Sequence, residues 1–278
     1  MAEFHRLKSL KDQEPAEWAA LNRQAEALTK TVRTAELPSL QHLKMADYAA
    51  VYEPAEDTYL LVDAMQYALD QGAFDDADDD NNNNKACTLL EIGCGTGVPT
   101  VWFRHAWQRR YPHRTLHTYV TDINPKAIEV ALATDQINNP QLAPIHAVRC
   151  DLATALVQDL AGAVDVLIFN PPYVPTPDDE VVDFEADRTL IDTITGDEII
   201  AAAWAGGANG RRVVDRALAQ VQGLLRGTAF LVTVDDNQPA ALSQLCAQKY
   251  QLSMTPLLRR RTRNEYLTIQ RLQPLAQS

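Results

Sequence analysis

The sequence has few cysteines, no long apolar stretch and no excess of positive charge, and each absence excludes a class of protein. Its four cysteines, at positions 87, 94, 150 and 246, form no Cys-x-x-Cys pair, so we expect neither a zinc site nor a disulfide framework. Reduced thiols are typical of the cytoplasm and the nucleus, where we expect the protein to act. The charged N-terminal segment lacks the apolar core of a secretory signal. No apolar stretch approaches the about 20 residues of a membrane-spanning helix, so we expect no membrane contact.

Positive charge is scarce. The chain has 25 Lys and Arg against 37 Asp and Glu, which gives a formal net charge of −12. A protein that neutralises the phosphates of a nucleic acid needs a basic surface. The main basic run is formed by the arginines at positions 259, 260, 261 and 263. Nucleic acid is therefore disfavoured as the main partner, although this run leaves a local contact open.

The 278 residues are consistent with one α/β domain, over residues 46–278, and appended segments. Residues 1–45 predict a helical N-terminal extension, because apolar side chains recur at spacings of three and four after Pro15. These side chains form one stripe that must pack on the main body or on a partner: Trp18, Leu21, Ala25, Leu28, Val32 and Ala35. Residues 72–85 are acidic and rich in Asn, which predicts a disordered insertion.

From residue 86 onward, short apolar runs alternate with helical stretches. Strands are expected at 87–92, 116–121, 145–149, 164–169 and 228–234, and helices at 98–110, 125–138, 153–160 and 211–225. This regular alternation predicts a mostly parallel sheet with helices on both faces. The last apolar runs, at 250–256 and 264–271, predict an antiparallel hairpin at the edge.

A glycine-rich turn follows the first expected strand, in the sequence Glu91-Ile-Gly93-Cys-Gly95-Thr-Gly97. Glycines there allow the backbone to approach a ligand, and the next helix presents unpaired N–H groups. NAD-binding proteins also use such a turn, but their fingerprint is G-x-G-x-x-G/A, whereas this loop is G-x-G-x-G. The carboxylate of Glu91 suits a cationic, amine-bearing ligand better than a diphosphate.

Two further acids follow the next two expected strands. Asp122 is placed to accept hydrogen bonds from a ribose diol, and Asp151 to accept one from an adenine amino group while Leu152 packs on the ring. Each acid taken alone could equally cap a helix. Three acids at successive strand ends, without clustered Lys or Arg, predict S-adenosylmethionine (AdoMet) rather than NAD or ATP.

The fourth expected strand runs into Asn170-Pro171-Pro172-Tyr173. The prolines restrict the backbone and hold the Asn170 amide in one place. A planar amide or adenine nitrogen is a poor nucleophile, because its lone pair is delocalised. Hydrogen bonds from its two N–H groups to the Asn170 side-chain oxygen and the Pro171 carbonyl would favour a pyramidal nitrogen, while Tyr173 supplies a wall. The motif indicates methylation of an amino group without saying which one.

These motifs resemble those of the HemK-type protein-glutamine methyltransferases, most closely the eukaryotic and archaeal branch that acts on class I translation termination factor. The matching segments are VYEPAEDTYLL from position 51, LEIGCGTG from 90, TDINP from 121, the strand ending in NPPYVP from 164, and AWAGGANGR from 203. The NPPY motif is shared with DNA adenine methyltransferases, whereas the YEPAEDT and AWAGG-NGR segments narrow the branch.

The resemblance implies a class I (Rossmann-like) AdoMet-dependent methyltransferase fold with a seven-stranded sheet. It implies cofactor contacts at Tyr52, Thr58, Glu91, Gly93, Gly95, Gly97, Asp122, Asp151, Leu152 and Asn170, with no metal. Catalysis is assigned to Asn170, Pro171 and Tyr173, and acceptor binding to Asn170, Pro171, Pro172, Tyr173 and Val174. The implied acceptor is the glutamine of the GGQ loop in eukaryotic-type release factor 1, methylated at N5.

The resemblance also implies a partner, the small zinc-binding activator subunit shared by several eukaryotic methyltransferases. It would form a heterodimer at the exposed sheet edge, near residues Ile145 to Arg149. Residues 1–45, the insertion at 72–85 and the long loop at 178–201 are extra relative to the family pattern. The last of these follows the acceptor pocket, so it bears on acceptor choice.

Three alternatives remain at this point. A protein lysine, as on a histone, would have to lose a proton to a base, which a neutral Asn170 cannot supply. DNA adenine N6 would require a flipped base and a track for phosphates. A non-catalytic assembly subunit would not need the complete set of Glu91, Asp122, Asp151 and Asn170 that the sequence contains.

Overall fold

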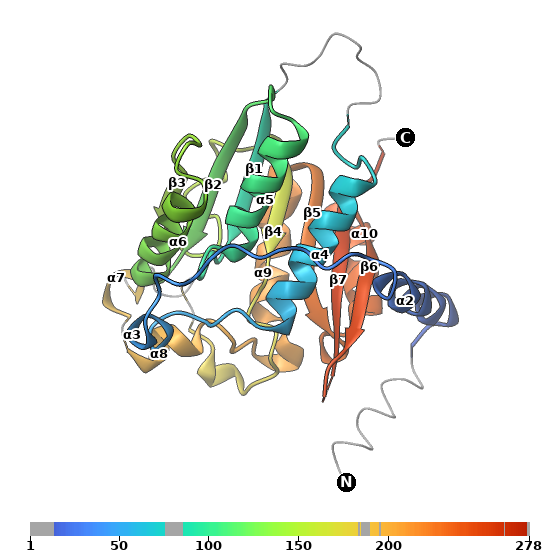
Figure 1. Ribbon diagram of the computed structural model, residues 1–278. Helices are drawn as coiled ribbons and strands as arrows, with labels where there is room; N and C mark the ends of the chain where they lie inside the picture. The colour runs from blue at the N-terminus through green and yellow to red at the C-terminus, as the bar shows by residue number, and fades with distance from the viewer. Residues whose placement is uncertain are drawn as a thin grey trace.

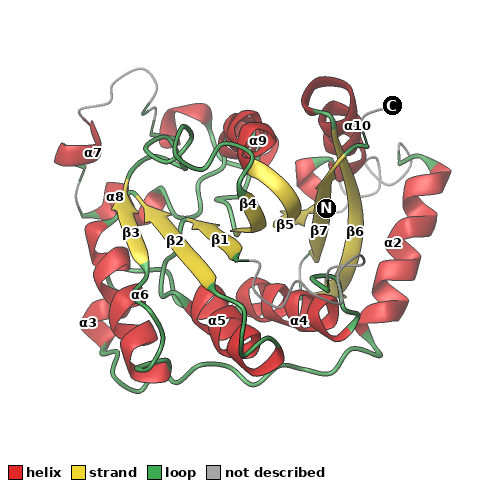
Figure 2. Cartoon of the chain, turned by 90° about the horizontal axis from the view of Figure 1, so that it is seen from above, coloured by secondary structure: helices red, strands yellow, loops and turns green. Residues whose placement is uncertain are grey.

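The computed structural model shows one seven-stranded sheet between two layers of helices (Figures 1 and 2). It describes residues 14–75, 86–182, 184, 190–194, 196–263 and 265–276. The sequence predictions for residues 1–13 and 76–85, and for part of the segment 178–201, therefore lie outside the described residues.

The sheet has the order β3-β2-β1-β4-β5-β7-β6. Its strands are β1 Cys87–Ile92, β2 Leu116–Asp122, β3 His146–Arg149, β4 Val164–Phe169, β5 Leu225–Val234, β6 Leu252–Arg261 and β7 Tyr266–Pro274. The first five strands along the chain are parallel, and β7 is antiparallel to both β5 and β6. The expected fold class, including the C-terminal hairpin, is confirmed. The strand order reverses between β1 and β4, which is where an open α/β sheet binds its ligand.

Helices cover both faces of the sheet, as Figure 2 shows from above. One face carries α4 Glu56–Asp70, α5 Val98–Arg110 and α6 Pro125–Asn138, and the other carries α9 Arg212–Leu224 and α10 Pro239–Tyr250. Both faces of β4 are buried: Val166 and Ile168 join the core beneath α4 and α5, whereas Leu167 and Phe169 join the core beneath α9. No helix among the described residues is long and apolar enough to cross a membrane.

The expected helix at 153–160 is wrong. The segment forms a series of turns, several of them closed by hydrogen bonds that span three residues, such as Thr154 N to Asp151 O and Leu156 N to Ala153 O. Its apolar side chains nevertheless reach the core, because successive turns repeat at nearly the helical spacing. The helices α4 and α10 were not predicted. The expected loop at 178–201 contains the short helices α7 Leu190–Thr193 and α8 Asp197–Ala201.

The N-terminal extension spans the sheet from one side to the other. Helix α2, Ala16–Thr29, lies beside the edge strand β6, where Thr29 Oγ1 accepts a hydrogen bond of 2.8 Å from the Arg259 N–H. Residues 30–44 then cross the layer of α4, α5 and α6 to reach α3, Met45–Tyr48 (Figure 1). The Ala35 N–H donates to Asp63 of α4 on the way, at 3.0 Å. The predicted apolar stripe thus packs on the main body.

Two members of the arginine run at the end of β6 form internal ion pairs. Arg259 pairs with Asp235 at 2.8 Å, and its guanidinium lies over the Tyr266 ring. Arg260 pairs with Asp63 at 2.7 Å. These side chains are therefore engaged with the protein itself rather than arrayed along a surface as a phosphate track would require.

The cysteines and the acidic side chains show no cross-link or metal cluster in the part of the chain that the structure describes. All four cysteines are buried and none forms a disulfide. No group of three or more His, Cys, Asp or Glu side chains in the described ranges could hold a metal ion.

Candidate active site

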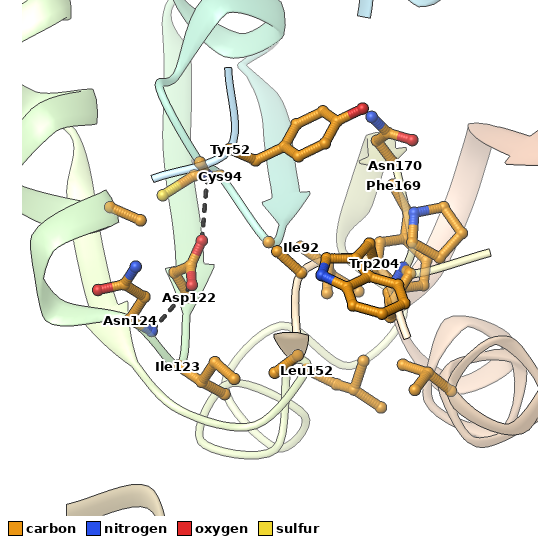
Figure 3. A pocket seen from close by; sticks show the side chains of 18 of the residues that line it. Tyr52, Ile92, Cys94, Asp122, Ile123, Asn124, Leu152, Phe169, Asn170 and Trp204 are labelled. Atoms are coloured by element: carbon orange, nitrogen blue, oxygen red, sulfur yellow. Dashed lines mark hydrogen bonds between the residues drawn. The ribbon is translucent and has the colours of Figure 1, made fainter. Parts of the chain in front are cut away.

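A cavity opens at the carboxyl ends of β1, β2 and β4, where the strand order reverses (Figure 3). It brings together nearly every residue that the sequence assigned to cofactor or acceptor. Those that line it are Tyr52, Thr58, Glu91, Gly93, Gly95, Asp122, Asp151, Leu152, Asn170, Pro171, Pro172, Tyr173 and Val174. Gly97 is the predicted site residue that lies outside this lining.

The glycines of the loop after β1 differ in their surroundings. Gly93 and Gly95 have φ of +69° and +50°, and a Cβ atom at either position would meet nothing within 4 Å. This open, left-handed backbone forms a cradle against which a ligand can lie. A Cβ atom on Gly97 would instead come within 2.9 Å of Ala131 on α6. Gly97 therefore allows α5 and α6 to pack closely, and its assignment to the cofactor stays a prediction.

Glu91, near the end of β1, is a buried carboxyl without a cationic partner among the described residues. Its side chain is 2% exposed and accepts a hydrogen bond of 3.3 Å from the Thr100 N–H. Burial raises the pKa of Glu91 to about 8. A cationic ligand group beside it would stabilise the ionised form. The carboxyl thus fits a ligand that, like AdoMet, carries an ammonium and a sulfonium.

Asp122 organises the loops that face the cavity. One carboxylate oxygen accepts from the Gly95 N–H at 3.0 Å and the other from the Asn124 N–H at 2.9 Å (Figure 3). Burial raises the pKa of Asp122, and these N–H donors oppose the rise. Each oxygen keeps a further lone pair, so the carboxylate can still accept from a ribose diol. Asn124 caps α6 and donates to the Ala50 carbonyl at 2.7 Å.

Asp151 differs from its expected surroundings, because it forms an ion pair with Arg216 of α9. Arg216 also lines the cavity, and sequence reasoning missed it. Leu152 follows with φ of +51°, and in Figure 3 it lies with Ile123 on the same side of the cavity. These two apolar side chains fit a flat adenine ring. The adenine contact of Asp151 stays a prediction, with one of its oxygens already engaged by a guanidinium.

Asn170, directly after β4, lines the cavity and has one side-chain atom without a hydrogen-bond partner among the described residues. Its Nδ2 donates to Asp57 Oδ2 at 3.1 Å, whereas its Oδ1 is buried and has no hydrogen-bond partner among the described residues. An unsatisfied buried acceptor is costly, so its retention calls for an explanation. A bound group with an N–H donor would satisfy it.

Asp57, at the start of α4, is a functional candidate that sequence reasoning missed. It is 2% exposed and accepts from the Tyr173 hydroxyl at 3.0 Å and the Tyr52 hydroxyl at 3.3 Å. Burial and the charge of Asp57 raise the pKa of Tyr52 to about 12, and they raise that of Tyr173 far above its usual range. Both phenols therefore remain protonated donors. The only local signal was the position of Asp57 inside the YEPAEDT segment.

The AWAGG segment forms backbone hydrogen bonds with the residues that follow Asn170. The Val174 N–H donates to the Trp204 carbonyl at 3.1 Å, and the Gly206 N–H donates to the Val174 carbonyl at 2.8 Å. A Cβ atom on Gly210 would overlap the Tyr173 carbonyl oxygen, so a glycine is required there. These contacts hold the segment after Asn170 against the AWAGG segment, and both line the cavity.

An apolar rim surrounds the mouth of the cavity. Tyr52, Val174 and Trp204 are large apolar or aromatic side chains that line the cavity, yet each stays between 37% and 40% exposed. Trp204 was not predicted as a site residue. Exposed aromatic side chains at a cavity mouth are typical of a surface that receives a partner or substrate.

Comparison with known proteins identifies similar chains. Residues 79–191 match the model of the methyltransferase small domain. The mouse protein "Methyltransferase HEMK2" is 37% identical over 204 residues, 73% of this chain and 80% of the mouse protein. Its human counterpart is 35% identical over 230 residues, 82% of this chain and 92% of the human protein. The "eRF1 methyltransferase catalytic subunit mtq2" of Schizosaccharomyces pombe is 29% identical over 241 residues, covering 84% of this chain and 94% of that protein.

Among solved structures, the fold is similar to that of the E. cuniculi Mtq2-Trm112 complex, which methylates the eRF1 translation termination factor. The TM-score is 0.51 at 24% sequence identity, and the match covers 81% of this chain and 99% of that chain. At this identity the likeness supports a shared fold.

Proposed function

The chain belongs to the HemK-type family of AdoMet-dependent methyltransferases, with HEMK2 among its relatives, and we propose that it methylates N5 of the glutamine in the GGQ loop of eukaryotic-type release factor 1. The observation that carries the proposal is the Asn170 Oδ1, a buried acceptor on a cavity-lining residue that has no hydrogen-bond partner among the described residues. A primary amide has two N–H donors on one nitrogen, and one of them can satisfy this oxygen. The fission yeast relative, by its name, acts on eRF1.

The residues of the cavity activate the amide by positioning it. Asn170 Oδ1 and the Pro171 carbonyl accept the two N–H groups, which favours a pyramidal nitrogen whose lone pair points away from the carbonyl plane. AdoMet, when bound, supplies an electrophilic methyl group on its sulfonium. Holding the nitrogen in line with that carbon contributes much of the rate, because the approach becomes effectively intramolecular. The residues for AdoMet itself are the Gly93–Gly95 cradle, Glu91, Asp122 and the apolar pair Ile123 and Leu152.

The surroundings of Asn170 favour an amide over the alternative acceptors. A lysine arrives as an ammonium and must lose a proton before attack, but Asn170 is neutral and Asp57 is already committed to its hydrogen bonds. A DNA adenine would need phosphate contacts, and Arg259 and Arg260 are engaged in internal ion pairs. The hydrogen bond that orients Asn170 against Asp57 also favours an enzyme over a non-catalytic assembly subunit.

We further propose that a small zinc-binding activator subunit docks at β3. This strand pairs with β2 on one side only and forms the edge of the sheet. An unpaired strand edge is a template for association with another chain. On α6, which packs beside β3, Leu132 and Ile137 are exposed apolar side chains. The related E. cuniculi protein was solved as a complex with Trm112.

The test is a methyl-transfer assay with labelled AdoMet, using the chain co-expressed with the activator subunit. The acceptors are wild-type release factor 1, its GGQ Gln→Ala variant, a histone mixture and duplex DNA. We expect label on the wild-type factor and none on the variant. Label only on histone or DNA would keep the AdoMet site and overturn the acceptor. Binding of AdoMet without any transfer would favour the assembly subunit.

A further inference from the structure

The side-chain amide of Asn170 has two ends of opposite polarity, and the end that is not bonded to Asp57 decides which groups of a ligand it can bind. The Oδ1 end accepts an N–H, whereas the Nδ2 end only donates. A 180° turn about the last side-chain bond would exchange them with almost no change in shape. An enzyme that uses this oxygen as an acceptor therefore needs a neighbour that fixes the orientation.

Asp57 provides that neighbour. An ionised carboxylate has acceptors only, so the end of Asn170 that lies 3.1 Å from Asp57 Oδ2 must be the donor, Nδ2. The reversed amide would place oxygen against oxygen in a site where Asp57 is 2% exposed. Water cannot relieve that repulsion, because a buried charge of this kind is poorly screened.

The carboxylate is itself held from several directions. The hydroxyls of Tyr173 and Tyr52 donate to Oδ2, at 3.0 and 3.3 Å, and the Thr58 N–H donates to Oδ1 at 2.6 Å. These donors come from the NPPY segment, the segment before α4 and the first turn of α4. Asp57 thus cannot turn away to release Asn170, and Figure 3 shows the Tyr52 hydroxyl pointing toward the Asn170 amide.

We propose that Asp57 is a positioning residue that locks the Asn170 amide with Oδ1 toward the acceptor nitrogen. It acts through Asn170 and does not itself touch the acceptor. This proposal rests on one part of the proposed function, namely that Asn170 accepts a hydrogen bond from an N–H of the acceptor. It does not depend on which amino group that acceptor is. It explains why a buried acid lies in the YEPAEDT segment, 113 positions before Asn170.

The first test is Asp57→Asn, which keeps the shape and removes the charge. The new amide at position 57 can donate to Asn170 Oδ1, which stabilises the reversed orientation of Asn170 and removes its acceptor from the substrate. We expect kcat to fall by about 10²-fold, as for other misplaced reacting groups, with AdoMet affinity and Tm close to wild type. An unchanged kcat, or a loss confined to KM or Tm, would overturn the proposal.

Asp63→Asn is the matched control. Asp63 lies on the same helix, is 4% exposed and also accepts two kinds of donor, the Ala35 N–H and the Arg260 guanidinium. Neither of these donors lines the cavity. We expect this variant to lower Tm and to leave kcat near wild type, the reverse of Asp57→Asn. A similar loss of kcat in both variants would mean that any buried charge on α4 matters, and would overturn a specific role for Asp57.

The reciprocal double variant, Asp57→Asn with Asn170→Asp, separates orientation from structure. A carboxylate at position 170 accepts the acceptor N–H from either oxygen, and the amide at position 57 donates to it. We expect the double variant to recover part of the kcat that each single variant loses. Two merely structural losses would instead accumulate, so a double variant no better than either single variant would contradict the proposal.

Failure of the proposed role of Asp57 can be distinguished from failure of the proposed function. Kinetics are measured with whichever acceptor the wild-type complex labels, so a different acceptor overturns the function but still tests Asp57. An acceptor-free readout is the NMR signal of the Asn170 side-chain NH2, assigned by its loss in Asn170→Ala in the full chain with its activator. We expect that signal to shift in Asp57→Asn and to stay in place in Asp63→Asn. An unmoved signal in Asp57→Asn would overturn the proposal.

Discussion

Arg216 of α9 forms an ion pair with Asp151, the acid that follows β3, across the wall of the cavity. Both side chains are largely buried, at 15% and 14% exposure. The pair joins a helix on one face of the sheet to the strand ends that receive the cofactor. The position of Asp151, which the sequence assigns to adenine, therefore depends on a residue 65 positions away.

Arg216→Met should weaken AdoMet binding. Removing the guanidinium releases the Asp151 carboxylate from the place in which this pair holds it, and we expect its hydrogen bond to the ligand to be lost, which lowers the binding free energy by about 1–3 kcal/mol in calorimetry. Arg226→Met is the control, because Arg226 also pairs with an acid, Asp165, at 2.7 Å, in a more exposed place away from the cavity. Equal affinities of the Arg216 variant and wild type would show that the pair is irrelevant to the cofactor.

Four elements next to the site, β1, β4, α5 and α6, were predicted to the residue, because strong local signals mark their ends. β1 and α5 flank the loop from Gly93 to Gly97, and α6 begins at Pro125 after the capping residue Asn124. Strands buried on both faces, such as β4, appear as continuous apolar runs. Local sequence therefore located the cavity.

The misses have a common physical cause, which is dependence on distant contacts. Residues 153–160 have helical spacing of apolar side chains but form turns against the core. Asp57 looks like an ordinary acid in the first turn of a helix until Asn170, 113 positions later, is placed beside it. Trp204 becomes part of the rim only because its backbone pairs with Val174.

Asn170→Ala should slow transfer strongly and leave substantial AdoMet binding. The variant removes the atom that accepts the N–H of the acceptor, whereas the Gly93–Gly95 cradle, Glu91 and Asp122 remain. We expect single-turnover rates to fall by about 10²–10³-fold, the usual loss when one preorganised hydrogen bond to a reacting group is removed. Near wild-type transfer in this variant would refute the mechanism.

Gly97→Ala and Gly93→Ala should separate packing from ligand binding. The Cβ atom introduced at position 97 would overlap Ala131, so we expect a loss of about 1–3 kcal/mol in the free energy of unfolding, with little direct effect on AdoMet affinity. At position 93 no protein atom is met within 4 Å, and the Cβ atom would instead occupy the ligand cradle. We expect that variant to bind AdoMet more weakly. The two are compared by denaturant unfolding and calorimetry, and a reversed pattern would place the cofactor against Gly97.

The raised pKa of Glu91 predicts opposite pH dependences for stability and for AdoMet binding. In the cofactor-free chain, the pKa lies near 8 when folded and near its ordinary value of 4.5 when unfolded, so the folded state binds the extra proton. Its contribution to stability is complete below pH 4.5 and is lost as the pH rises through about 8. AdoMet affinity should rise over the same window, because the ionised carboxylate attracts the cationic ligand.

Glu91→Gln tests this argument, since an amide cannot ionise and is nearly the same size. We expect the variant to be more stable than wild type above pH 8 without cofactor, and its denaturant-unfolding free energy to vary less with pH between 4.5 and 8. Its AdoMet affinity should be lower than that of wild type at alkaline pH and nearly independent of pH. Parallel pH profiles for variant and wild type would show that Glu91 remains ionised throughout, held by a cation or donor in the fold, and that it does not respond to the charge of the ligand.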